Sequence, residues 1–139
     1  MKADHAAAVR RVAATLRRKG AIVQVQPAGS HVSLIVDGAF VGVRVASVCT
    51  LPHAVTVRGK RYTYTYDRLI WNLHTHGRRC GDVVAWVLVG PAQVYIVPAH
   101  AVRGKTVTLH LGRKRSRAAV MAYRDEWGVL VPAGRRRAA

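Results

Sequence analysis

The chain has 139 residues, half of them hydrophobic, and carries 23 Lys and Arg against 6 Asp and Glu, a formal net charge of +17. The length predicts one domain over residues 1–139, and the apolar fraction excludes a disordered basic tail. No folded core requires so large a positive excess, whereas the phosphates of DNA and RNA attract it, so the composition favours a nucleic-acid partner.

The first predicted element is a helix from about Asp4 to Lys19, ended by Gly20. Apolar residues at helical spacing form a stripe on one side, from Val9 to Leu16. The opposite side carries four arginines with no intervening Glu, which suits either contact with phosphates or a solvated helix face. These arginines are Arg10, Arg11, Arg17 and Arg18.

Strands separated by turn signals follow the helix. Asp37-Gly38-Ala39, Gly59-Lys60 and Gly90-Pro91 are the predicted turns. A short helix over 118–127 is expected to close the domain. The order predicts an α+β or mixed α/β fold, a central β-sheet flanked by helices. The predicted strands are 21–26, 31–36, 40–48, 55–58, 61–66, 82–89, 93–97 and 107–111.

Several motifs in this order resemble a known nuclease superfamily. Ser33-Leu34-Ile35-Val36-Asp37 is followed by Val43-Arg44-Val45-Ala46-Ser47, then by apolar motifs beginning at Gly81 and Val94, and by a Tyr123–Trp127 segment. Together they are similar to the PD-(D/E)XK nucleases, and most of all to the group I intron-encoded homing endonucleases of that type. The resemblance covers nearly the whole chain and implies a restriction-endonuclease-like core.

The resemblance also implies where the catalytic residues of an active relative would stand. The family's Asp falls on Ser33, its Glu or Gln on Arg44 and its Lys on Ala46, and its first-helix Glu falls within residues 6–8. None of these positions keeps the family's side chain, and Mg²⁺ needs oxygen ligands. We therefore expect a DNA-binding protein that has lost cleavage and needs no cofactor.

An active Mg²⁺-dependent endonuclease with a rearranged site is the alternative. The chain has one Glu and five Asp, so such a site would have to use Asp37 together with Asp4 or Asp82. Asp37 also suits a predicted turn, where Asp is common because its side chain bonds the local backbone. Asp37 is therefore the fallback catalytic residue.

Zinc is a weaker metal candidate. Cys49-x-x-x-His53 and His74-x-His76-x-x-x-Cys80 supply suitable ligand types at a spacing that is not that of a standard finger. Loop histidines and small buried thiols explain the same residues. Two cysteines make no disulfide framework, which favours a reducing cytoplasm, where a DNA-binding protein would associate with the nucleoid. The richness in Ala, Val and Arg suggests GC-rich coding and hence a bacterium or its phage. No apolar run exceeds strand length, so we expect no membrane span, signal peptide or membrane partner.

Tyr62, Tyr64 and Tyr66 alternate with polar residues and share one face of a predicted strand. That face is expected to point into the core, although stacking on bases, as in an RNA-binding module, stays open. By analogy with relatives of the fold, a homodimer on duplex DNA is expected. The predicted nucleic-acid contacts are Arg10, Arg11, Arg17, Arg18, Arg44, Arg58, Lys60, Arg61, Arg78, Arg79, Arg113, Lys114, Arg115 and Arg117.

Overall fold

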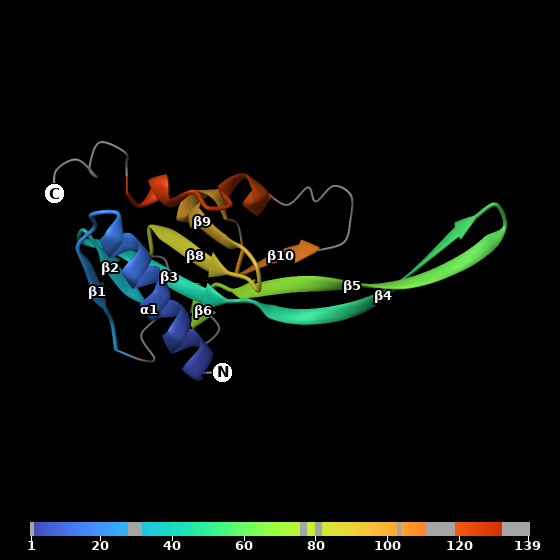
Figure 1. The fold of residues 1–139 in the computed structure, drawn as a ribbon, viewed down its shortest axis with the longest axis horizontal. Helices are drawn as coiled ribbons and strands as arrows, with labels where there is room; N and C mark the ends of the chain where they lie inside the picture. Colours follow the sequence, from blue (N-terminus) through green and yellow to red (C-terminus); the bar gives the residue numbers. More distant parts are fainter. Residues whose placement is uncertain are drawn as a thin grey trace.

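The computed structural model describes residues 2–27, 32–75, 78–79, 82–102, 104–110 and 119–131. A helix lies against a five-stranded sheet, and a long hairpin projects away from this body (Figure 1). The strand order is β1-β2-β3-β8-β9, in which β3 and β8 run parallel and all other neighbours antiparallel. These elements are α1 (Lys2–Arg18), β1 (Val23–Val25), β2 (Leu34–Val36), β3 (Ala39–Val45), β8 (Ala85–Val89) and β9 (Val94–Pro98).

A second sheet has the order β10-β5-β4 and contains the projecting hairpin. The predicted mixed α+β class, with a helix against a central sheet, is confirmed. No helix in the described ranges is long and apolar enough to span a membrane. The remaining elements are β4 (Ser47–Val57), β5 (Lys60–Asn72), β6 (His74–Thr75), β7 (Arg78–Arg79), β10 (Thr106–His110) and the 3₁₀ helices η1 (Ala99–Ala101), η2 (Ala119–Tyr123) and η3 (Trp127–Val129).

The alternation along β3 divides the core into two layers. Val41 and Val43 pack with the apolar stripe of α1, which ends at Leu16. On the other side of the sheet, Trp86 of β8 packs with Trp71 of β5. The second sheet therefore covers the face that α1 leaves open, and both tryptophans are fully buried.

The predicted strand over 40–48 is two strands. The chain leaves the first sheet after Val45 and enters the second at Ser47, while the N–H of Ala46 still donates to the carbonyl of Val89 at 2.9 Å. The predicted strands leave out residues 49–54, which β4 spans without a break. Pro52 is tolerated because β4, within the described residues, pairs only with β5 and is an edge strand.

The closing helix predicted over 118–127 is wrong. Two short 3₁₀ helices, η2 and η3, stand there instead, and Ala118 lies outside the described residues. Asp125 has a φ of 53° and its N–H donates to Val94, which diverts the chain along the outer edge of β9. A continuous helix cannot include that left-handed residue.

Candidate nucleic-acid interface

The projecting part of the β4–β5 hairpin is called the arm. Strand β10 stops pairing with β5 at Arg68, so over residues 50–57 and 60–67 the two strands pair only with each other (Figure 1). At about 3.3 Å per residue, the arm reaches about 26 Å. Arg58 and Gly59 form its tip with φ values of 54° and 76°, the combination of a type I′ turn. The tip lies one residue earlier than predicted.

The register gives the arm two different faces, because directly paired residues share a face. Tyr62 lies opposite Val55, Tyr64 opposite His53, and Tyr66 opposite Leu51. The aromatic face comprises Leu51, His53, Val55, Val57, Lys60, Tyr62, Tyr64 and Tyr66. The threonine face comprises Thr50, Pro52, Ala54, Thr56, Arg61, Thr63, Thr65 and Asp67.

The prediction that the tyrosine stripe faces the core is wrong. Tyr62 is 49% and Tyr64 45% exposed, because the arm leaves the body before these residues and neither hydrophobic core extends to them. The rings contact one another and their neighbours along the face. His53 meets Tyr64 edge-on at 5.2 Å and Tyr66 at 6.1 Å between centroids, and Tyr66 lies 5.7 Å from His110 of β10.

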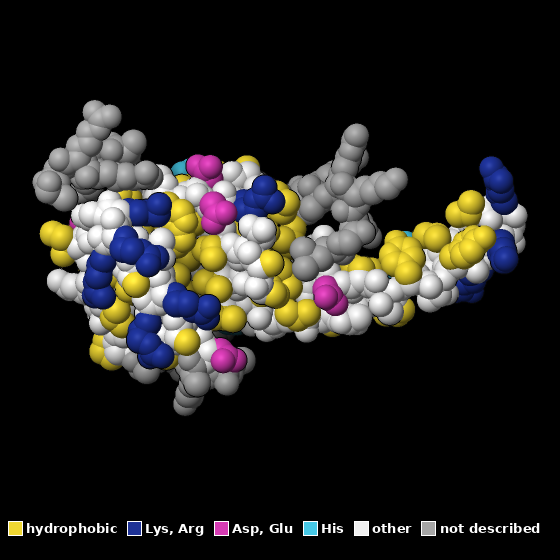
Figure 2. Space-filling model, in the orientation of Figure 1, with side chains coloured by type: hydrophobic (Ala, Val, Ile, Leu, Met, Phe, Trp, Pro, Cys, Tyr) yellow, Lys and Arg dark blue, Asp and Glu magenta, His cyan; other side chains and the backbone are white. Residues whose placement is uncertain are grey.

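Two clusters of cations lie far apart on the molecule (Figure 2). At the arm tip, Lys60 lies 5.9 Å from the centre of the Tyr62 ring. On α1, Arg17 donates to the carbonyl of Val23 at 2.8 Å and Arg18 to the hydroxyl of Thr15 at 3.2 Å. Within the described part of the chain, none of these exposed cations pairs with a carboxylate. The clusters are Arg10, Arg11, Arg17 and Arg18 on α1, and Arg58, Lys60 and Arg61 at the tip.

Of the other predicted contacts, only Arg44 has a described side chain. Arg44 lies inside the body, half-buried. The backbones of Arg78 and Arg79 form β7, and nothing is described of their side chains. The basic run of Arg113, Lys114, Arg115 and Arg117 lies outside the described residues.

The positions that the nuclease resemblance assigns to catalysis are occupied by structural side chains. Ser33 is buried, and its hydroxyl accepts a hydrogen bond from the Val43 N–H at 3.0 Å. The carbonyl of Val43 accepts from His5 of α1 at 2.9 Å and from Arg44 at 3.0 Å. Strand β2 no longer pairs with β3 at Val43. The side chains of Ser33, His5 and Arg44 therefore bond the Val43 N–H and carbonyl that β2 leaves unpaired. Sequence reasoning missed His5, since a lone helix histidine gives no signal of this role.

Trp86 and Arg44 fill the same face of β3. Gly42 is paired with Trp86, and the guanidinium of Arg44 lies 5.0 Å from the centre of that ring while donating to the carbonyl of Asn72 at 3.0 Å. Ala46 packs against the same cluster. A hydroxyl engaged with a peptide, a guanidinium and a methyl group do not fit Mg²⁺, which needs several oxygen ligands.

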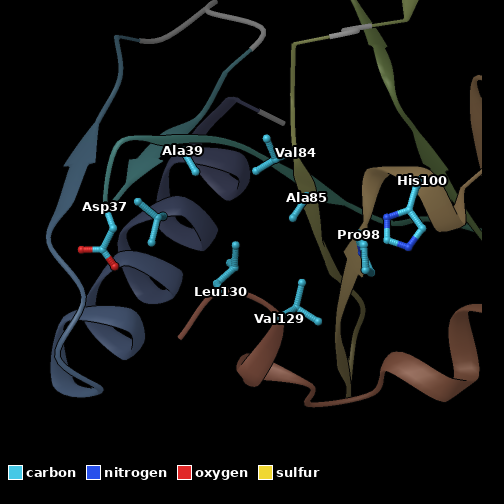
Figure 3. Close-up of a pocket in the computed structure, with 9 residues that line it drawn as sticks. Asp37, Ala39, Val84, Ala85, Pro98, His100, Val129 and Leu130 are labelled. Atoms are coloured by element: carbon cyan, nitrogen blue, oxygen red, sulfur yellow. The ribbon is translucent and has the colours of Figure 1, made fainter. Parts of the chain in front are cut away.

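Asp37 lies in the predicted turn, and its carboxylate bonds a peptide 15 residues away. It forms the β2–β3 turn with Gly38, and its carboxylate accepts from the Ile22 N–H at 2.9 Å. It also lines a hollow of about 470 Å³ that includes His100 and is otherwise apolar. Figure 3 shows the Asp37 carboxylate and the His100 ring on opposite sides of that hollow. Among the described residues, the lining holds no second carboxylate, and neither Asp4 nor Asp82 belongs to it.

The zinc ligands are not brought together by the described fold. Cys49, a free thiol, and His53 lie four residues apart on one strand, about 13 Å along it. His74 lies on β6, and its ring contacts the carbonyl of Lys105 at 3.4 Å. His76 and Cys80 are outside the described residues, and among those described no three His, Cys, Asp or Glu residues group as metal ligands.

Comparison with known proteins places the fold among nuclease-like folds. The sequence matches no protein-family model and no curated protein. Among solved structures it is similar to the bacterial homing endonuclease I-Ssp6803I, with a TM-score of 0.62 and 16% sequence identity over 97% of this chain and 95% of that one. The predicted homing-endonuclease-like fold is confirmed. At this identity the likeness shows the fold alone.

Proposed function

We propose that this protein binds duplex DNA through a PD-(D/E)XK-type fold, folded as one domain, from which the cleavage site has been lost. The single observation that supports DNA binding is the pair of cation clusters, on α1 and at the arm tip, that have no carboxylate partner among the described residues. Each neutralised phosphate releases counterions, so such clusters supply affinity for any DNA. The fold is also that of a protein described as a homing endonuclease.

The arm suits a duplex by its dimensions. The major groove admits a two-stranded β-ribbon, and the arm is such a ribbon with a cationic turn at its end. Its threonine face offers hydroxyls and methyl groups, which contact base edges and thymine methyls. The helix arginines would then contact phosphates elsewhere on the duplex.

Loss of cleavage follows from the residues around Val43. Ser33 is engaged with the Val43 peptide, and Arg44 occupies the face of β3 with Trp86. A guanidinium there repels a divalent cation and attracts phosphate. We therefore expect DNA to be bound and released intact in the cytoplasm.

The test is binding to labelled duplex DNA across a salt series, with and without Mg²⁺, followed by a denaturing gel. We expect steep salt dependence and intact strands under both conditions. Arg10→Gln with Arg11→Gln should weaken binding. Arg124→Gln, an arginine beside Asp125 and Glu126, is the matched control and should leave it unchanged.

Each part of the proposal can fail separately. Strands cut only when Mg²⁺ is present would overturn the loss of cleavage and return attention to Asp37. Absence of salt-dependent binding by the unaltered protein would overturn DNA binding. Sedimentation of the complex on a short duplex tests the expected homodimer, since two protomers per duplex would be observed.

A further inference from the structure

The aromatic face of the arm is an exposed apolar surface that phosphate contacts leave unused. Val57 is 52% exposed, and Tyr62 and Tyr64 are nearly as open. Neither hydrophobic core includes any residue from 47 to 68. An isolated two-stranded ribbon is marginally stable in water, so an aromatic face on one indicates a surface that gains a partner.

The charges on this face select the chemistry of the partner. Lys60 lies over the Tyr62 ring at 5.9 Å, and Arg58 precedes it in the tip turn. The carboxylate nearest in sequence, Asp67, belongs to the threonine face, where it accepts from Thr50 at 2.8 Å. A second copy of the chain would bring its own Lys60 and Arg58 against the same two cations, which repel them. A partner with flat apolar rings and negative charge complements the face, and a polynucleotide has both.

The rings are also held in a fixed order. Tyr62 and Tyr64 are two residues apart on one strand, a spacing of about 6.6 Å. His53 packs edge-on against Tyr64 and continues the contact to Tyr66. Sheets with exposed aromatic rings stack two or three successive bases in this manner. Ordered rings lose little side-chain freedom on binding.

We propose that the aromatic face binds unpaired bases of a locally melted DNA strand, which stack on Tyr62 and Tyr64. The bases of an intact duplex are covered by their neighbours, so only unpaired bases present a free ring face. This inference rests on DNA being the partner, as proposed above. It adds that the protein prefers DNA with an opened segment.

The test compares a fully paired duplex with the same duplex carrying a short unpaired bubble. We expect the protein to bind the bubble more tightly, and Tyr62→Ala with Tyr64→Ala to reduce that affinity at least about tenfold while leaving paired-duplex affinity unchanged. Thr63→Ala with Thr65→Ala, on the opposite face, is the matched control and should keep the bubble preference. Tyr62→Phe with Tyr64→Phe should also keep it, because stacking needs the ring and not the hydroxyl.

A second measurement does not depend on the variants folding. A photoreactive 5-iodouracil placed in the bubble should crosslink to the peptide containing Tyr62 and Tyr64. A bubble preference that survives the alanine changes, or crosslinks only elsewhere, would overturn the inference. Tighter binding of single-stranded RNA, or tyrosine-dependent self-association without DNA, would overturn it in favour of those partners. The proposed function is tested separately by binding to the fully paired duplex. If Arg10→Gln with Arg11→Gln abolishes this binding and the tyrosine changes keep it, the proposed function is supported, whatever the result with the bubble.

Discussion

Gly42 on β3 lies directly against the ring of Trp86, its partner on β8. A Cβ at Gly42 would come within 2.5 Å of Trp86 Cε3, and the buried ring has no room to move. We predict that Gly42→Ala lowers the free energy of unfolding by about 1–3 kcal/mol, the usual effect of overpacking. Gly128, with no atom within 4 Å of a built Cβ, is the matched control. Equal melting temperatures for the two variants would contradict the packing.

Among the described residues, Tyr95 has a shifted pKa that links stability to pH. Burial raises the pKa of its phenol, Asp125 raises it further and Arg124 lowers it, with burial the largest cause. The folded pKa therefore exceeds the unfolded value, about 10, so the stabilisation is present below pH 10 and is lost as pH rises through the folded pKa. We predict that Tyr95→Phe reduces the fall in unfolding free energy above pH 10. Denaturant titrations of both proteins at pH 8 and pH 11 measure this fall. An equal fall in the unaltered protein and in Tyr95→Phe would contradict the prediction.

At the scale of elements, the arm should be separable from the body. Cys49 and Arg68 are directly paired across β4 and β5, so a two-residue Asn-Gly turn can join them in place of residues 50–67. Because neither core contains an arm residue, we predict that this deletion keeps the body folded, with unchanged tryptophan fluorescence. Its DNA affinity should fall, and any bubble preference should vanish. Unfolding of the shortened chain would show that the arm supports the body.

The sequence was informative where the signal is local. The stripe of α1, the Asp37-Gly38 turn and the apolar run of β8 all predict elements that the structure contains. The direction of the tyrosine stripe was not predictable, because alternation shows that a strand has two faces and not whether anything packs on either. The surroundings of Arg44 were equally hidden. The carbonyl of Asn72 is 28 residues away and the Trp86 ring lies on another strand, so only the tertiary fold joins them.

For the whole molecule, the positions of the charges determine how DNA can be contacted, and the total charge does not. The arginines of α1 and the cations of the arm tip lie at opposite ends of the visible face, whereas the acidic groups are scattered over the body and the base of the arm (Figure 2). Two separated clusters can contact phosphates at two distant places on one duplex, or on two duplexes. The composition predicted a polyanionic partner, but the separation of the clusters is a property of the fold.

The dependence of DNA affinity on salt distinguishes these arrangements. Each phosphate contact contributes about −0.9 to the slope of log K against log salt concentration. If both clusters contact one duplex, Arg10→Gln with Arg11→Gln should make the slope less negative by up to about 2. Arg58→Gln with Arg61→Gln should do the same, and combining the two pairs should give the sum. Fluorescence anisotropy of labelled duplex between 50 and 200 mM salt measures the slope, with Arg124→Gln as the control. If one pair of substitutions leaves the slope unchanged, that cluster does not contact the bound duplex, and the affinity comes from the other end of the molecule.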